Sequence, residues 1–113
     1  MTDTTISQLE TKLNIKARVS AYAGAYSIAR DGVLIRAYKD STVEAEAGAI
    51  AVGYPGSRVI AHCGSTVLAY GGSVTEAEAG AKITAREGSI VYTDNPEDVE
   101  ADPGASVLPL SAK

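Results

Sequence analysis

Two pairs of glutamates are the residues of this chain whose spacing best suits chemistry. Glu44 and Glu46 are two residues apart, as are Glu76 and Glu78. On a β-strand such residues share one face and lie about 6.6 Å apart, a separation within the range that glycoside hydrolases use for their paired carboxyl groups. Nothing around them predicts a cleft or apolar surroundings that would drive the two pKa values apart. We therefore expect a solvated acidic face, and a protein that is not an enzyme.

The adjacent residues His62 and Cys63 are the second candidate for chemistry, as a metal site or a nucleophile. Adjacent residues of a strand point to opposite sides, and one histidine with one cysteine cannot supply the three or four ligands that a metal needs. A symmetric trimer would bring three copies of His62 to one axis. The simpler expectation is a surface histidine between Glu46 and Glu78. The glycine-rich stretches lack the spacing of a phosphate-binding loop, so we expect no cofactor and no metal.

These residues are positioned by an eight-residue repeat, which runs ten times from Ala17 to Pro96 without an insertion or deletion. The third position is mostly valine or isoleucine, the fifth mostly alanine, and the eighth mostly glycine. Alternation of apolar and polar positions is the period of a strand with one buried face. Glycine supplies a turn because it tolerates a positive φ. Each repeat therefore predicts one short strand and one turn, and the repeats are expected to stack into a solenoid.

Tyrosines set the size of the coil. They occupy the sixth position of alternate repeats, sixteen residues apart: Tyr22, Tyr38, Tyr54 and Tyr70. A coil of sixteen residues places them in one column, whereas a coil of twenty-four would scatter them over three faces. We predict an all-β, two-sided β-solenoid, of the β-helix or β-roll kind, with eight residues per strand and turn, sixteen residues per coil and about five coils. In this register Arg30 lies over Glu46.

The two ends of the chain depart from the repeat. Ile6, Leu9 and Leu13 would form one apolar face of a short N-terminal helix, which either caps the first coil or docks as an arm on another subunit. From Thr93 the repeat weakens into an acidic stretch with two prolines. The chain is thus divided into a cap helix or arm (1–16), the repeat solenoid (17–96) and a C-terminal cap or docking tail (97–113).

Composition limits the partners. The chain lacks phenylalanine and tryptophan, so its core must be built from small side chains in thin layers. Its net charge of −4 argues against a nucleic-acid-binding face. One cysteine excludes an internal disulfide, and no segment has the apolar length of a secretion signal or a membrane span. We expect a protein made in the cytoplasm that binds neither nucleic acid nor membrane.

The tyrosine column is the candidate interface. It is predicted to share its face with apolar neighbours, and together they form a broad outer patch: Leu34, Tyr38, Ile50, Val52, Tyr54, Leu68 and Tyr70. A contiguous exposed patch of this kind usually marks a protein interface. The rings can also serve only to stabilise their own solenoid by stacking. We expect a homo-oligomer, with a trimer favoured over a dimer, or docking on a larger protein assembly.

One run of the repeat resembles a known family. The sequence STVLAYGGS, from Ser65 to Ser73, is similar to the octapeptide halves of bacterial ice-nucleation repeats, which are sixteen-residue β-solenoids with a tyrosine ladder. That family presents regular Thr-x-Thr rows to water. The threonines here occupy three different repeat positions and form no row: Thr42, Thr66, Thr75 and Thr84.

The blocks DSTVEAEAG (40–48) and GSTVLAYGG (64–72) also resemble octapeptide β-helix repeats of bacterial and phage proteins, and octapeptide strands occur in the trimeric β-helices of phage tail spikes. This resemblance implies a rigid structural element without catalytic residues, usually in a homotrimer. The expected function is therefore structural, as a capsid decoration protein or spike module carried in a phage particle. One alternative is an inhibitor that binds another protein, such as an acidic mimic of DNA that would inhibit a DNA-binding protein through the four glutamates. The other alternative is an ice- or polysaccharide-binding solenoid.

Overall fold

The structure, a computed structural model, describes residues 15–112. Ile15 and Lys16, the first described residues, are not helical. The predicted N-terminal helix, with Ile6, Leu9 and Leu13, lies outside the described residues.

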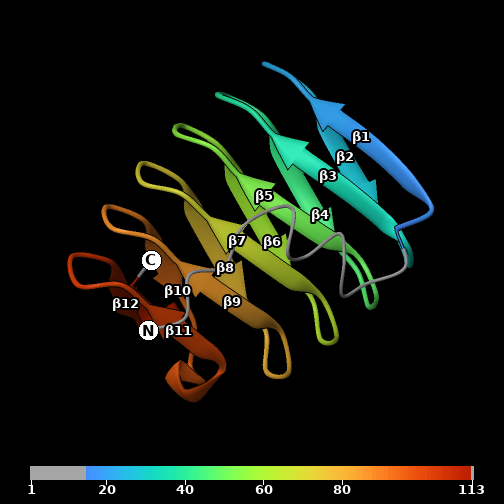
Figure 1. Ribbon diagram of the computed structural model, residues 1–113. Coiled ribbons are helices and arrows are strands. Elements are labelled where there is room, and N and C mark those ends of the chain that lie inside the picture. Colours follow the sequence, from blue (N-terminus) through green and yellow to red (C-terminus); the bar gives the residue numbers. More distant parts are fainter. Residues whose placement is uncertain (1–14, 113) are drawn as a thin grey trace.

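The described chain is a two-sided parallel β-solenoid (Figure 1), in which successive strands alternate between two facing sheets. The first sheet contains β1 (Ala17–Ala21), β3 (Val33–Ala37), β5 (Ile50–Gly53), β7 (Thr66–Ala69), β9 (Lys82–Ala85) and β11 (Val99–Ala101). The second contains β2 (Tyr26–Ala29), β4 (Thr42–Ala45), β6 (Arg58–Ala61), β8 (Val74–Ala77), β10 (Ile90–Tyr92) and β12 (Ser106–Leu108). Two short 3-10 turns complete it, η1 (Pro96–Asp98) and η2 (Leu110–Ala112).

Every described strand pair has the sixteen-residue register that the tyrosines predict. Ala21 lies beside Ala37 in the first sheet, and Ala29 lies beside Ala45 in the second. The turns stack in the same register, since the Gly48 N–H donates to the carbonyl of Gly64 at 3.0 Å. The prediction of a two-sided solenoid with sixteen residues per coil is therefore confirmed.

The end of every repeat except the one closed by Pro96 has a left-handed backbone, which explains the glycine there. Gly48 has a φ of 81°, a region that side chains other than that of glycine seldom adopt. Asp40 takes the same place in its repeat with a φ of 66°, which aspartate tolerates better than most residues. In these repeats the chain can therefore reverse direction after the strand and begin the opposite sheet without a longer loop, whereas the connection from β10 to β11 contains the 3-10 turn η1.

The core lies between the sheets and is built from the third and fifth repeat positions. Its larger members are fully buried valines and isoleucines such as Ile35, Val43 and Val59, and alanines fill the layer beside them. Serines at the first position are also buried, and Ser41 is satisfied because its hydroxyl donates to the carbonyl of Tyr38 at 2.6 Å. Small side chains let the two sheets approach closely, as the composition predicts.

The structure has six coils rather than the five expected, because the C-terminal segment adds a further coil. β11 pairs with β9 and β12 pairs with β10 in the same register as the rest. Val99, Ala101 and Gly104 occupy the third, fifth and eighth positions of an eleventh repeat. Its proline, Pro103, stands in the turn before glycine, where Pro55 stands in an earlier repeat, so it does not interrupt strand pairing.

Candidate interaction surfaces

The tyrosines form one continuous stack on the margin of the first sheet, as the sequence predicts. Ring centroids lie 5.1 Å apart between Tyr22 and Tyr38, and 4.9 Å apart between Tyr38 and Tyr54. Between Tyr54 and Tyr70 the centroids are 5.4 Å apart and the rings are inclined by 14°. These spacings follow the separation of neighbouring strands, so the ladder is imposed by the register of the coils. Tyr22, at the first coil, is 64% exposed, and the ring faces of the inner tyrosines are covered by their neighbours.

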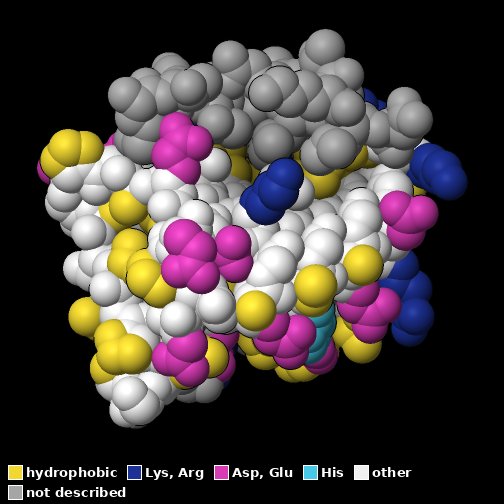
Figure 2. All heavy atoms as spheres, turned by 90° about the horizontal axis from the view of Figure 1, so that it is seen from below, with side chains coloured by type: hydrophobic (Ala, Val, Ile, Leu, Met, Phe, Trp, Pro, Cys, Tyr) yellow, Lys and Arg dark blue, Asp and Glu magenta, His cyan; other side chains and the backbone are white. Residues whose placement is uncertain are grey.

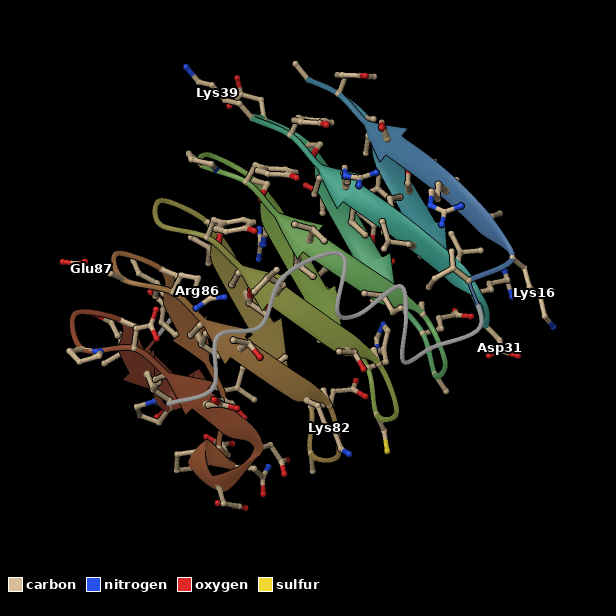
Figure 3. All side chains as sticks on the ribbon, in the orientation of Figure 1. Lys16, Asp31, Lys39, Lys82, Arg86 and Glu87 are labelled. Carbon is tan, nitrogen blue, oxygen red and sulfur yellow. The ribbon has the colours of Figure 1, made fainter. Side chains whose placement is uncertain are left out.

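The column continues beyond the last tyrosine as a pair of opposite charges. Arg86, the residue after β9, follows Tyr70 at the sixth repeat position and lies in line with the rings (Figure 3). Its guanidinium is 3.7 Å from the carboxylate of Asp102, in the next coil. In this column the four tyrosines therefore stack on one another, and Arg86 meets an opposite charge one coil away.

The apolar neighbours of the tyrosines are buried, and the expectation of an open apolar patch is wrong for them. Leu34, Ile50, Val52 and Leu68 are each at most 1% exposed and form a cluster separate from the core. They stand at the second and fourth repeat positions, on the face of the first sheet that points away from the core. Among the described residues, Ile15, Tyr54 and Tyr70 pack against them.

This burial changes the candidate interface. Strand alternation correctly places the four aliphatic side chains outside the core, but it says nothing about what lies on that side of the sheet. Because they are covered, they offer no apolar surface to a partner. Of the predicted patch, Tyr38, Tyr54 and Tyr70 remain partly exposed, and their role in an interface stays a prediction.

The outer face of the second sheet carries the predicted acidic residues, and the structure joins them into a network around His62. The Nε2 atom of His62 lies 2.9 Å from Oε1 of Glu44, and its Nδ1 atom lies 3.0 Å from Oε2 of Glu78. The hydroxyl of Tyr26 donates to the other oxygen of Glu44. Figure 2 shows acidic and apolar side chains interleaved along the lower margin of the molecule, with the histidine among the acids.

Both ring nitrogens of His62 face a carboxylate, which favours the doubly protonated imidazolium. Hydrogen bonds to Glu44 and then Glu78 raise the pKa of His62 above its ordinary value of 6.5. The same contacts lower the pKa of Glu78, and those of Tyr26 and His62 lower the pKa of Glu44. A ring held in this way has no nitrogen left to ligate a metal or to act as a base. Its partners are Glu44 and Glu78, and not Glu46 and Glu78 as the sequence predicted.

The remaining two glutamates are also paired. Nε of Arg58 donates to Glu76 at 2.7 Å, and Arg30 lies 3.5 Å from Glu46, as the predicted register requires. Beside the Arg58 pair is a shallow groove of about 420 Å³, bordered by Val74 and by Tyr92 on β10. No pattern in the sequence predicts this groove, which lies where the turn residues Gly56 and Gly72 meet larger side chains of neighbouring coils. Since its charged side chains bind each other, it holds no unpaired charge to select a ligand.

Cys63, the neighbour of His62 in the sequence, takes no part in the network around that histidine through its thiol. Cys63 is exposed at a turn and its thiol is free. Within residues 15–112, no group of three or more histidine, cysteine or acidic side chains is placed to hold a metal ion. No helix in the described part of the chain has the length and apolar character needed to cross a membrane.

Comparison with known proteins gives no relative: no family model, no curated protein and no solved structure matches this chain.

Proposed function

We propose that this protein is a non-enzymatic structural element, a rigid β-solenoid that self-associates or docks on a larger assembly. The observation that carries the proposal is the unbroken register of its two sheets, in which every described coil repeats the one before it. Such a stack resists bending because each strand is hydrogen-bonded to the coils beside it. The histidine and the four glutamates that could do chemistry are paired with other side chains, as His62 is with Glu44 and Glu78.

A virus particle is the setting that we propose, as a capsid decoration protein or spike module made in the cytoplasm and carried in the particle. The support is the similarity of residues 40–48 and 64–72 to octapeptide repeats of phage β-helix proteins. Those proteins usually form homotrimers, and a trimer would be consistent with that setting. The partly exposed tyrosine ladder and the unpaired strand edges are the surfaces through which copies would meet.

The alternatives considered from the sequence have less support. A mimic of DNA needs carboxylates that are free to meet a basic partner, whereas Glu44, Glu76 and Glu78 already bind histidine or arginine. An ice-binding face needs a row of exposed threonines, whereas Thr75 is fully buried.

The absolute mass of the protein in solution, measured by light scattering after size exclusion, tests the proposal. Self-association predicts a mass above the 11.6 kDa of one chain. A mass of one chain at every concentration would contradict self-association. Docking on another component is then tested by co-purification with assembled particles, and absence from such particles would contradict the structural role.

A further inference from the structure

Within residues 15–112, no further strand covers either end of the solenoid. In each sheet the terminal strand pairs on one side only, namely β1 and β2 at the first coil and β11 and β12 at the last. Val19, at an inward-facing third position, is 42% exposed, whereas Ile35 in the next coil is 1% exposed. At the other end Val99 and Ala105 pack against the core and stay partly exposed. The core therefore reaches the surface at both ends.

Edge backbone groups at both ends point along the solenoid axis. The Tyr38 N–H donates to the Ala21 carbonyl at 2.9 Å, so alternation directs the N–H of Ser20 away from β3. At the last coil the Asp102 N–H donates to the Ala85 carbonyl at 2.8 Å, so the carbonyl of Ala101 faces away from β9. Each end thus has outward N–H groups and outward carbonyls. When the first end of one copy is placed on the last end of another, the N–H groups of each end face the carbonyls of the other.

The two ends carry opposite charge. The first described coil has three basic side chains, Lys16, Arg18 and Arg30, against one acid, Asp31. The last coil, 97–112, has four acids and no base: Glu97, Asp98, Glu100 and Asp102. Lys16 and Asp31 lie at the corner of the first coil (Figure 3). Like ends therefore repel each other, and unlike ends attract.

From these observations we propose that copies of this chain stack head to tail, with β1 and β2 of one copy pairing with β11 and β12 of the next. The inference rests on the proposed function and deepens it by naming the partner, a second copy, and the contact surface. Continuing the sixteen-residue register across the junction places Val19 on Val99 in the core and Arg18 on Asp98 outside it. On the second sheet it places Ile28, 47% exposed, on Leu108, 38% exposed.

Among the described residues, the segment that follows β12 is hydrogen-bonded to the fifth coil. The Leu110 N–H donates to the Asp94 side chain at 3.0 Å, which holds the start of the last turn beside the fifth coil. The contact is heterologous, because one end of the molecule meets the opposite end of its neighbour. Such a contact has no closing symmetry in a straight stack, so the products are linear oligomers of increasing length.

Sedimentation of the full chain over a range of concentrations, at low and at high salt, tests the inference. We expect the average mass to rise with concentration without reaching a fixed limit, and to fall when salt screens the opposite charges. The variant Ser20→Pro removes an outward N–H and should weaken association about tenfold or more, while Ser20→Ala, which keeps that N–H, should not. A thermal melt of each dilute variant verifies that the monomer still folds.

A pair of charge reversals separates specific pairing from general repulsion. Arg18→Glu and Lys82→Glu change the net charge equally and occupy the same repeat position, but Lys82 is on β9, which is paired on both sides. We expect only Arg18→Glu to weaken association. Equal effects would mean that net charge alone controls it, and would overturn the proposed junction.

The remaining outcomes distinguish this inference from the function on which it rests. A closed oligomer of fixed mass that is insensitive to Ser20→Pro would overturn head-to-tail stacking and leave self-association standing. A monomer at every concentration and salt would overturn both the stacking and the self-association.

Discussion

The substitution Leu68→Ala tests most directly whether the apolar side chains on the outer face of the first sheet are covered. Leu68 is 0% exposed although its side chain points away from the core. Because Leu68 is covered, removal of its three outer carbons leaves a cavity that the neighbouring Ile50 and Val52 fill only in part. Leucine-to-alanine changes at such sites cost about 2–5 kcal/mol of unfolding free energy.

Ile28→Ala is the matched control. Ile28 occupies the same repeat position on the outer face of the second sheet and is 47% exposed. Because about half of its surface is already in water, its truncation should cost less than about 1 kcal/mol. The two variants thus compare one covered and one open face of the same solenoid.

Urea unfolding at several low protein concentrations is the assay, since a midpoint that does not move with concentration excludes a contribution from association. We expect a large decrease in the midpoint for Leu68→Ala with an unchanged slope, and a small decrease for Ile28→Ala. Equal small decreases would show that Leu68 is open to solvent, and the interpretation of the outer cluster as a covered layer would fail.

Three further predictions concern single side chains. Thr75→Val should raise the unfolding free energy by about 1 kcal/mol, because the buried hydroxyl of Thr75 has no hydrogen-bond partner; a lower melting temperature would contradict this. Gly71→Ala should cost about 1–3 kcal/mol in urea unfolding, because its new Cβ would lie 2.5 Å from a backbone oxygen of Glu87, and an unchanged midpoint would mean that the turn yields. His62→Gln should remove a pH-dependent part of the stability. Because the pKa of His62 is raised above 6.5 in the folded protein, its stabilisation is complete below pH 6.5 and is lost as pH rises through the raised pKa. Because the pKa of Glu78 is lowered from 4.5, its stabilisation is present above pH 4.5 and is lost as pH falls through the lowered pKa. Wild type and variant should therefore differ most between pH 4.5 and 6.5, and a difference independent of pH in unfolding titrations would refute the pairing.

The repeat makes the coil predictable from sequence, because the residue type at each repeat position has one physical cause. A left-handed turn explains Gly48, a layer between close sheets explains the alanines, and one column per coil explains the spacing of Tyr38 and Tyr54. The sixth coil was missed because proline and acidic residues suggested an end. In the structure Val99 pairs with Ile83 of β9, and Gly104 has the left-handed backbone of the other repeat ends.

The contacts of the surface were less predictable, since a repeat fixes which face a side chain takes but not what it reaches. His62 was expected to meet the residues directly beside it, whereas it also reaches Glu44 diagonally, eighteen residues away. Arg58 reaches Glu76 over the same separation. Long side chains lean along the strand and can contact diagonal neighbours, so a purely column-wise interpretation misses these pairs. The burial of Leu68 on the outer face likewise cannot be predicted from the repeat pattern.

The sixteen-residue register underlies the ladder, the acidic network and the open ends, and the single cysteine allows it to be measured directly. Cys63 occupies a turn position whose equivalent in the next coil is Ala79. Stacked turns are about 4.8 Å apart, which is within the range of Cα separations that a disulfide spans. Mild oxidation of Ala79→Cys, followed by mass spectrometry of the peptides, should therefore give an intrachain disulfide with Cys63, whereas Glu87→Cys, the position required by a coil of twenty-four residues, should not. A disulfide in the second variant and none in the first would contradict the register and with it the account of this protein.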